Sequence, residues 1–455
     1  MLHFNDENLV HEKVFRDPIH GQIIVDNQII MDLINTPEFQ RLRRVKQLGT
    51  SSFTFHGAEH SRFGHCLGVY EITRKMCNYF QRNYPSTQPD DGLWDDSERP
   101  VALCAALLHD LGHGPYSHTF EHIFGTDHEQ ITRQLITDPS TNINKILSRV
   151  SPDFPHQVAS VIDHTYENQQ VVQMISSQID ADRMDYLQRD SYYTGTSYGK
   201  FDLDRVLHVM RPVKNGIAFQ ISGMHAVEDY IISRLQMYLQ IYFHPVSRSM
   251  EVILDHLLMR AKYIYEHPND FDPDFTPHML MPFFNHKFTL DDYLALDDGV
   301  LTTYFNHWTH SQDKVLSDLS RRFLYRQPFK SAVYDKESAE CLPKLRELIQ
   351  TAGFNSDYYT AVNDSFKLPY DTYNPQDGIN QSQIELVQPN GDFIELSQVS
   401  TLVASVSGRE AGDQRFFFPK EMLETHQDIE VFEPIYEQFQ SYIKNNHIIN
   451  PKEDK

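Results

Sequence analysis

Hydrophobic residues recur along most of this chain at the spacing of amphipathic helices, while a few short segments have the pattern of β-hairpins. Residues 13–25 predict one hairpin, because two apolar runs flank a turn that contains a proline and a glycine. Another is predicted around Asn215-Gly216, and a third over 383–396, where Asn390-Gly391 supplies the turn. These segments predict small antiparallel additions to a helical protein.

Helix start signals are readable at several places. Thr36 followed by Pro37 is typical of an N-cap and a first helical position, Ser61 is placed to cap a long helix, and another helix is expected from near Arg99 to Gly112. Further helices are predicted near 128–136, 143–149, 155–164, 170–192, 224–244, 246–265 and 337–351. Prolines become frequent from about residue 268. We therefore expect a mainly α fold, with a helical core over 1–265 and a C-terminal α+β subdomain over 266–455.

Composition narrows the class of protein. The chain has 455 residues, is 40% hydrophobic, and carries a formal net charge of −23, which opposes non-specific binding of nucleic acid. The longest apolar run, Val101 to Leu108, is too short to cross a bilayer, and the first residues lack the pattern of a signal peptide. The four cysteines show no CxxC spacing, which fits a reducing compartment. We expect a cytoplasmic protein without a membrane partner and with nucleic acid an unlikely ligand.

Histidines cluster in the first third of the chain, where eight of the 24 lie between His56 and His128. The pair His109-Asp110 ends an apolar helix and is followed by a glycine, so that both side chains can face one cavity. By itself the pair also fits a core histidine beside a helix-capping aspartate. His65 and Asp182 are further candidate ligands, although the acidic segment 180–190 also fits a solvated helix face. Two imidazoles and two carboxylates suit Mn²⁺, Mg²⁺, Fe or Ni²⁺, with Zn²⁺ possible.

The ordered set His65, His109-Asp110 and Asp182 resembles the metal quartet of the HD phosphohydrolase superfamily. The surrounding sequence is similar to one branch, the deoxynucleoside triphosphate (dNTP) triphosphohydrolases, whose members are often allosteric homotetramers. The matching segments are Asp17-Pro18-Ile19-His20-Gly21, Thr36 to Arg43, Lys46 to Gly49, Glu59 to His65, His109 to His118 and Asp180 to Asp190, with weaker matches over Arg234–His244 and Arg326–Lys330. The likeness covers roughly residues 13–330 and implies a helical HD core.

The resemblance implies a reaction in which a dNTP is hydrolysed to a deoxynucleoside and tripolyphosphate. The metal would polarise the α-phosphate and activate water, while His128 would donate a proton to the leaving group or orient it. The implied catalytic residues are His128, His113, Glu129 and His118. The implied substrate-binding residues are Gln47, Leu48, Arg62, Tyr186, Asp190, Arg234 and Tyr242, of which Arg62 would contact phosphate and the tyrosines and Asp190 the deoxyribose.

The resemblance also implies a regulatory nucleotide site at a subunit interface. Residues 41–46 form the densest basic stretch of an acidic chain, which by itself equally fits a solvated helix face. The implied regulatory residues are Lys13, Val14, Asn35, Gln40, Arg43, Arg205, His244, Arg326 and Lys330. Asn35 stands where guanine-selective relatives carry aspartate, which weakens the case for guanine because an amide offers a different donor and acceptor pattern. Our hypothesis is activation by dGTP or GTP in a homo-oligomer, expected to be a tetramer, with the N-terminal hairpin and the C-terminal subdomain contributing to the interface.

Two other functions fit parts of the pattern. A different HD enzyme, such as a phosphodiesterase or a nucleotidase, would use the same metal quartet. A nucleotide-sensing or nucleic-acid-binding protein with an idle metal site is the non-enzymatic alternative, which the complete ligand set and the net charge disfavour. Analysis of the products would distinguish the triphosphohydrolase from another HD enzyme. Salt-sensitive oligonucleotide binding without turnover of a dNTP would favour the non-enzymatic binding protein.

Overall fold

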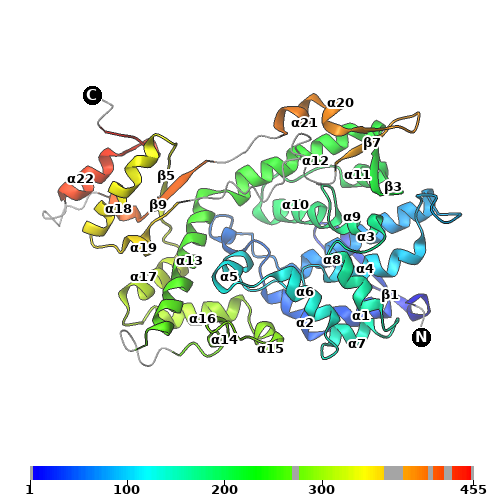
Figure 1. Cartoon of the computed structure of the whole chain (residues 1–455), viewed down its shortest axis with the longest axis horizontal. Coiled ribbons are helices and arrows are strands. Elements are labelled where there is room, and N and C mark those ends of the chain that lie inside the picture. The colour runs from blue at the N-terminus through cyan, green and yellow to red at the C-terminus, as the bar shows by residue number, and fades with distance from the viewer. Residues whose placement is uncertain (1–3, 269–275, 363–382, 408–412, 425–432, 452–455) are drawn as a thin grey trace.

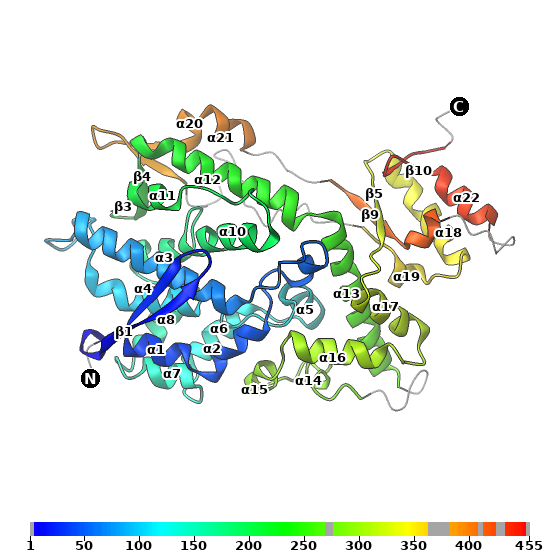
Figure 2. The ribbon, with the colours of Figure 1, turned by 180° about the vertical axis from the view of Figure 1, so that it is seen from behind.

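The computed structural model describes residues 4–268, 276–362, 383–407, 413–424 and 433–451. Helices dominate, with small sheets at the margins and a separate α+β lobe near the C-terminus (Figures 1 and 2). The predicted mainly α fold is therefore confirmed. None of the helices in these ranges combines the length and apolar character needed to cross a membrane.

Three helices form the frame of the central body. The long helix α3 (Arg62–Asn83) packs against α4 (Arg99–Leu108) and α10 (Ala181–Thr194). A Cβ atom at Gly68 of α3 would lie 1.8 Å from the Asp185 Oδ1 atom of α10. Only glycine therefore allows the two helices to approach as they do.

The remaining helices surround this frame or extend from it. In the N-terminal half they are α1 (Gln28–Ile34), α2 (Pro37–Arg41), α5 (Ser117–Phe124), α6 (His128–Thr137), α7 (Asn142–Leu147), α8 (Phe154–Ile162), α9 (Gln169–Ile175) and α11 (Leu203–Val209). They continue with α12 (Met224–Met237), α13 (Pro245–Glu266), α14 (Met281–Phe284), α15 (Leu290–Leu294), α16 (Asp298–Trp308), α17 (Lys314–Leu324), α18 (Leu342–Thr351), α19 (Ser356–Tyr359), α20 (Leu396–Val399), α21 (Thr401–Val406) and α22 (Glu433–Ser441).

Three small sheets complete the described part. Strands β1 (Asn8–Asp17) and β2 (Gly21–Asn27) form an antiparallel hairpin. A second sheet has the order β3-β4-β7-β8, with β3 (Met210–Val213), β4 (Gly216–Gln220), β7 (Glu385–Val387) and β8 (Phe393–Glu395). The third has the order β10-β11-β5-β9-β6, with β5 (Lys330–Val333), β6 (Ala361–Val362), β9 (Arg415–Phe418), β10 (Ile443–Lys444) and β11 (His447–Ile448).

The buried apolar residues fall into two clusters. The large cluster joins the helices of the N-terminal half with α13 to α17 and with the β7–β8 hairpin. The smaller cluster lies in the C-terminal lobe, where strands β5 and β9 pack against α18 and α22. The first core thus continues well beyond residue 265, and the predicted functional division at that position stays a prediction.

The predicted hairpins are all present, and Thr36 caps α2 by accepting a hydrogen bond from the Phe39 amide. The single helix predicted over 170–192 is wrong. The helix α9 ends at Ile175 with Ser176 in an extended conformation, and Asp180 starts α10 as a separate helix by accepting a hydrogen bond from the Arg183 amide. The helix predicted over 224–244 is α12 followed by a π-helical turn at Tyr238–Tyr242. The five-stranded sheet was not predicted, since its strands are short and far apart in the chain.

Candidate active site

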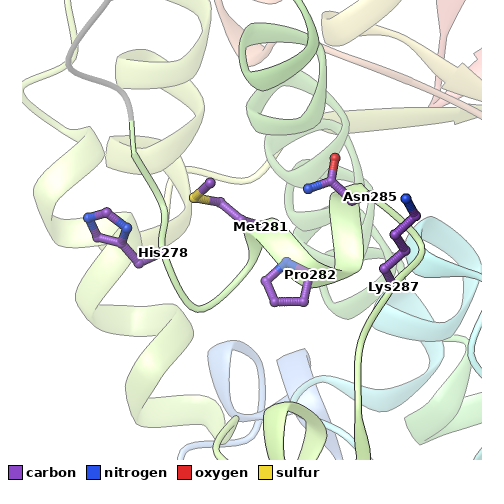
Figure 3. Close-up of a pocket in the computed structure, with 5 residues that line it drawn as sticks. All are labelled: His278, Met281, Pro282, Asn285 and Lys287. Carbon is purple, nitrogen blue, oxygen red and sulfur yellow. The ribbon is translucent and has the colours of Figure 1, made fainter.

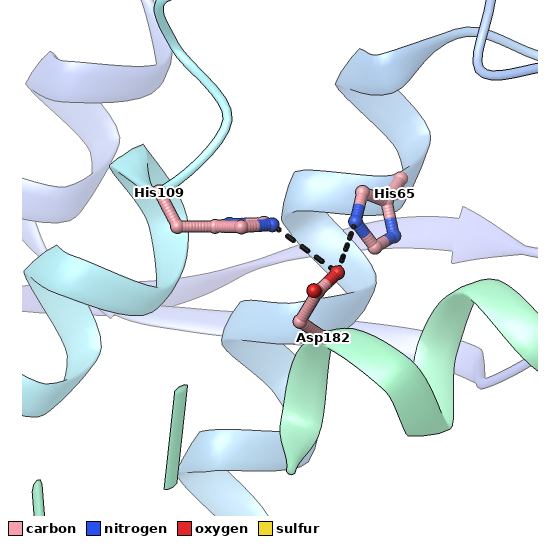
Figure 4. A group of neighbouring side chains, drawn as sticks. All are labelled: His65, His109 and Asp182. Atoms are coloured by element: carbon pink, nitrogen blue, oxygen red, sulfur yellow. Dashed lines mark hydrogen bonds and ion pairs between the residues drawn. The ribbon is translucent and has the colours of Figure 1, made fainter. Parts of the chain in front are cut away.

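Three of the four predicted metal ligands meet at one point between α3, α4 and α10 (Figure 4). The Asp182 Oδ1 atom lies 3.0 Å from His65 Nε2 and 3.5 Å from His109 Nε2. The fourth, Asp110, places its carboxylate oxygens 3.4 Å from His109 Nε2 and 3.7 Å from His65 Nε2. One nitrogen of each imidazole and both carboxylates thus border the same small space.

The hydrogen bonds of this cluster fit a divalent cation. The buried His109 Nε2 atom has no hydrogen-bond partner in the described part of the chain, while its Nδ1 atom lies 2.9 Å from the Ala106 carbonyl oxygen. On the other imidazole, His65 Nδ1 lies 2.8 Å from Asp185 Oδ2. In each ring Nδ1 lies beside an oxygen acceptor and Nε2 faces the cluster of ligands, an arrangement common among metal-binding histidines.

The charges of the cluster are strongly coupled. Burial lowers the pKa of His65, but hydrogen bonds to Asp182 and Asp185 outweigh it and raise that pKa to about 10. Burial alone would raise the pKa of Asp182, but His109 and His65 hold it below its usual value. Likewise, His113, His109 and Arg62 overcome burial and keep the pKa of Asp110 well below its ordinary range. The carboxylates are therefore ionised and the cluster is built to hold positive charge.

A second group of polar side chains continues from Asp110. His113 Nε2 lies 3.2 Å from Asp110 Oδ1, and the Ser117 hydroxyl lies 2.5 Å from His113 Nδ1 and 3.0 Å from Glu121 Oε1. Glu121 Oε1 also lies 3.0 Å from His128 Nδ1. Burial lowers the pKa of His128, but the hydrogen bond with Glu121 raises it overall. His128 is thus held in a form that can donate a proton.

The rings of His113 and His128 are stacked, with centroids 3.9 Å apart and planes 15° apart. Nitrogen lone pairs lie in the plane of an imidazole, so two parallel stacked rings do not point toward one shared ion. This geometry suits proton transfer better than a second metal site, although Glu121 completes a set of three possible ligands there. The pKa of His113 lies well below its usual value because of burial and the nearby Arg62.

The segment after the HD pair is tightly constrained. A Cβ atom at Gly112 would lie 2.2 Å from the His128 carbonyl oxygen, so α6 can approach this loop only at a glycine. Tyr116 adopts a left-handed conformation (φ 48°) directly before α5. Such a conformation costs about 1–3 kcal/mol in a residue other than glycine and is frequent at functional sites.

A cavity of about 400 Å³ opens onto both groups. Six of the seven predicted substrate-binding residues line it, namely Gln47, Leu48, Arg62, Tyr186, Asp190 and Tyr242, and so do Asp110, Asp182, His113 and His128. Arg234 is fully buried and donates to the Gln178 carbonyl and side-chain oxygens instead of lining the cavity. Glu129 is exposed, and nothing is described of the His118 side chain.

Part of the cavity wall is a set of hydroxyls around one carboxylate. Asp190 Oδ2 accepts a hydrogen bond of 2.7 Å from the Tyr242 hydroxyl, and Asp190 Oδ1 lies 2.8 Å from His60 Nε2. The hydroxyls of Tyr186 and Tyr238 lie 3.3 Å apart. Burial raises the pKa of both Tyr186 and Tyr242 well above the usual value, so these groups remain neutral hydroxyls.

Several residues of the site were not predicted. Glu121 contacts His128 across the turn between α5 and α6, and the αL glycine Gly125 between them was the available signal for that reversal. Cationic side chains at Lys46, Arg183 and Arg248 line the cavity, and of these Arg183 lies next to a predicted ligand in the chain. Asp185 and His20 support His65 from behind, a contact between distant segments that no local pattern reveals.

The predicted regulatory residues lie mostly on the surface and in several places. Lys13 and Val14 are on the exposed strand β1, Asn35 ends α1, and Arg205 lies on α11. Gln40 and Arg43 contact each other, and the Arg43 guanidinium lies 3.5 Å from the ring centre of Phe63. His244 begins α13, Arg326 donates to the Phe53 carbonyl, and Lys330 begins β5. Their joint role stays a prediction.

Another hollow lies near α14, lined by His278, Met281, Pro282, Asn285 and Lys287 (Figure 3). Its side chains are a proline, a methionine and three polar groups, none of them a carboxylate. It lacks the converging charges of the cavity at the HD pair, so we assign the chemistry to the latter.

Comparison with known proteins agrees with this geometry. The HD domain family matches residues 62–190, which contain all four predicted ligands, and the HD associated region matches 201–269. The protein YwfO of Bacillus subtilis is 50% identical over 416 residues, covering 91% of this chain and 94% of that protein. This chain belongs to the HD-domain phosphohydrolase family. The HD domain accounts for α3, α4 and α10, and the associated region for α11 to α13.

Two further relatives extend the comparison. The deoxynucleoside triphosphate triphosphohydrolase SAMHD1 homolog of Dictyostelium discoideum is 32% identical over 260 residues, covering 53% of this chain and 48% of that protein. The crystal structure of a phosphohydrolase from Bacteroides thetaiotaomicron is 25% identical with a TM-score of 0.75, covering 90% of this chain and all of that chain. The predicted family is therefore confirmed.

Proposed function

We propose that this HD-domain protein hydrolyses dNTPs to a deoxynucleoside and tripolyphosphate with the help of a divalent metal. One observation carries the proposal: a single cavity is lined by two of the four metal-type ligands, Asp110 and Asp182, by His128 and by the Tyr242–Asp190 pair. Asp182 connects this cavity to the other two ligands, because its Oδ1 atom lies 3.0 Å from His65 Nε2 and 3.5 Å from His109 Nε2. A triphosphate ester of a sugar needs these three functions together. The printed name of the Dictyostelium relative supports the choice of substrate.

His65, His109, Asp110 and Asp182 would hold the metal. When bound, a divalent ion there supplies polarisation of the α-phosphate and a lower pKa for water. Arg62 donates to Asp110 at 2.5 Å and also lines the cavity, so its guanidinium orients this carboxylate and adds positive charge for phosphate. Lys46, Arg183 and Arg248 add further positive charge to the same walls.

The reaction breaks the bond between the α-phosphorus and O5′ of the sugar. Water adds its oxygen to the α-phosphorus, so that the phosphate chain leaves as tripolyphosphate, and O5′ keeps the bonding electrons. This oxygen needs a proton to become the hydroxyl of the deoxynucleoside. His128 would donate it, because the hydrogen bond with Glu121 raises the pKa of His128 and favours its protonated form; general acids contribute about 10²- to 10⁴-fold.

The sugar would contact Tyr186, Asp190 and Tyr242. Asp190 accepts from Tyr242 and has lone pairs left for a 3′-hydroxyl. A tyrosine ring packed against C2′ leaves no room for a ribose hydroxyl, which would favour deoxy substrates. Gln47 and Leu48 would lie beside the base.

For regulation, we propose a guanine nucleotide, dGTP or GTP, bound between subunits of a homotetramer. The scattered surface positions of Arg43, Lys13 and Arg326 support a site completed by a second copy. Asn35 is exposed at the end of α1, and because it replaces the aspartate of guanine-selective relatives, the preference of this site for guanine has to be measured.

The test incubates the protein with Mn²⁺ and dATP, with and without dGTP, and resolves the products by ion-exchange chromatography. Deoxyadenosine with intact tripolyphosphate supports the proposal, whereas orthophosphate or a monoester would favour a nucleotidase or a phosphodiesterase. His109→Ala should abolish turnover. His122→Ala, at an exposed histidine of the neighbouring helix α5, is the matched control and should retain it.

A further inference from the structure

The corner between β1 and β2 points two buried side chains, Asp17 and His20, toward the residues behind the metal ligands. Asp17 shapes this corner, because its Oδ1 atom accepts hydrogen bonds from the amides of Ile19 and His20. The His20 side chain is only 1% exposed and points away from solvent. The segment Asp17-Pro18-Ile19-His20-Gly21 has no part in the chemistry proposed above, so the burial of the Asp17 and His20 side chains calls for another role.

Asp185 of α10 receives donors on both of its oxygens. His20 Nε2 lies 2.6 Å from Oδ1, and His65 Nδ1 lies 2.8 Å from Oδ2. Arg189 donates to both oxygens, at 2.9 and 2.8 Å. The same guanidinium donates to Asp17 at 2.8 Å. A fully buried carboxylate is thus held between the hairpin corner and a metal ligand.

The consequence for His65 is geometric. A carboxylate only accepts hydrogen bonds, so Asp185 takes the Nδ1 proton of His65 and leaves Nε2 facing Asp182 and the metal space. The direction of the His65 ring therefore depends on where Asp185 sits. That position depends in turn on His20 and Arg189, and on the absence of a side chain at Gly68.

We propose that His20 and Asp185 are positioning residues for the metal ligand His65, so that docking of the β1–β2 hairpin on α10 sets the affinity for a divalent cation. The inference rests on the proposed function through its metal ligand set. The competing explanation is that the buried charges only attach the hairpin to the core. The two explanations predict different results. If His20 and Asp185 orient His65, a change at His20 lowers the affinity for metal, whereas if they only attach the hairpin, such a change lowers the stability of the fold alone.

The first test measures Mn²⁺ affinity by titration of the metal-free protein, without nucleotide. His20→Asn places its amide nitrogen near the former Nδ1 position and loses the donor to Asp185, whereas His20→Gln places a donor near the former Nε2 position. We expect the dissociation constant for Mn²⁺ to rise about 10-fold or more in His20→Asn, as for other outer-shell changes, and to be largely restored in His20→Gln. His11→Asn, at an exposed histidine of the same hairpin, should match the unchanged protein.

Equal affinity in His20→Asn and the unchanged protein would overturn the proposal, and so would equal losses in the Asn and Gln variants. Thermal unfolding in EDTA checks that each variant is folded. If His20→Asn does not fold, hydrogen exchange of the unchanged protein decides, because linkage is reciprocal: saturating Mn²⁺ should slow exchange of amides in residues 13–25. No change there would contradict the proposal. Since no substrate is used, a protein that binds Mn²⁺ but does not hydrolyse dATP would refute the proposed function and leave this test intact.

Discussion

The metal cluster and the predicted regulatory residues differ in how much of each site one chain supplies. The cluster is assembled from α3, α4 and α10 within a single core, with buried side chains that orient one another. The regulatory residues lie on exposed strands, helix ends and turns of separate regions. One chain therefore brings all four predicted metal ligands together, whereas the proposed regulatory site would need residues from more than one region or copy.

This difference has a direct functional meaning. Substitutions in the cluster should remove the reaction itself, whatever the assembly state. Substitutions among the regulatory residues should change only the response to a second nucleotide. The predictions below test this division, beginning with the largest effect.

Removing a metal ligand should have the largest effect. His109→Ala deletes an imidazole whose Nε2 atom faces the carboxylates of Asp110 and Asp182 at 3.4 and 3.5 Å, where a metal would bind. We expect turnover of dATP to fall to background and Mn²⁺ binding to be lost, measured by titration and by product release. EDTA should have the same effect on the unchanged protein and be reversed by Mn²⁺. Turnover of dATP in both His109→Ala and the EDTA-treated protein would contradict the assignment of the reaction to the metal cluster.

His128→Asn should lower kcat by about 10²- to 10⁴-fold while metal binding is kept, because only the proton donor is lost.

Glu121→Gln should lower kcat less than His128→Asn does, and it should change the dependence of kcat on pH. Burial lowers the pKa of His128 and Glu121 raises it above its usual value, so removing the charge of Glu121 lowers that pKa. A general acid is active below its pKa, and the alkaline limb of kcat should therefore move to lower pH. Glu167→Gln, at an exposed acidic residue outside the predicted site, is the control.

Tyr242→Phe should have a smaller effect. It removes the hydroxyl that donates to Asp190 at 2.7 Å and keeps the ring. A hydrogen bond to a charged group contributes about 1.5–3 kcal/mol, so we expect kcat/KM for dATP to fall about 10- to 150-fold. Steady-state kinetics with dATP and ATP would show whether discrimination against ribose survives. Tyr192→Phe, at an exposed tyrosine of the same helix as Asp190, should leave both values unchanged.

Arg43→Ala should have the smallest effect on the cluster. Its guanidinium lies over Phe63 and pairs with Gln40 at the surface, and Arg43 is not among the residues that line the cavity. We expect unchanged Mn²⁺ affinity and a reduced stimulation by dGTP, measured as the ratio of rates with and without it. Arg82→Ala on α3 is an exposed arginine control. A loss of Mn²⁺ affinity in Arg43→Ala would show that the two regions are not separable.

Much of the architecture was predictable because local signals coincide with it. The hairpin turns, the Thr36 cap and the helical spacing all appear in the structure. The break between α9 and α10 was missed, since residues 176–180 contain no glycine or proline and the new helix starts at the Asp180 cap. The five-stranded sheet joins short strands between residues 330 and 448, and no local sequence pattern predicts that strands so far apart in the chain will pair.

The candidate site divides in the same way. The four metal ligands were named from motifs, and the structure brings them to one place. Glu129 was chosen because it adjoins His128 in the chain, whereas the neighbour in space is Glu121, which returns through the turn at Gly125. Support of His65 by Asp185 and His20 joins segments 165 residues apart and depends on tertiary packing alone.

The most direct test of the account is a single turnover of dATP in H₂¹⁸O with Mn²⁺, with mass spectrometry of both products. Water attack at the α-phosphorus with cleavage of the bond to O5′ predicts unlabelled deoxyadenosine and tripolyphosphate that carries one ¹⁸O atom. Formation of dAMP with pyrophosphate, release of orthophosphate, or label in the deoxyadenosine would contradict the proposed reaction.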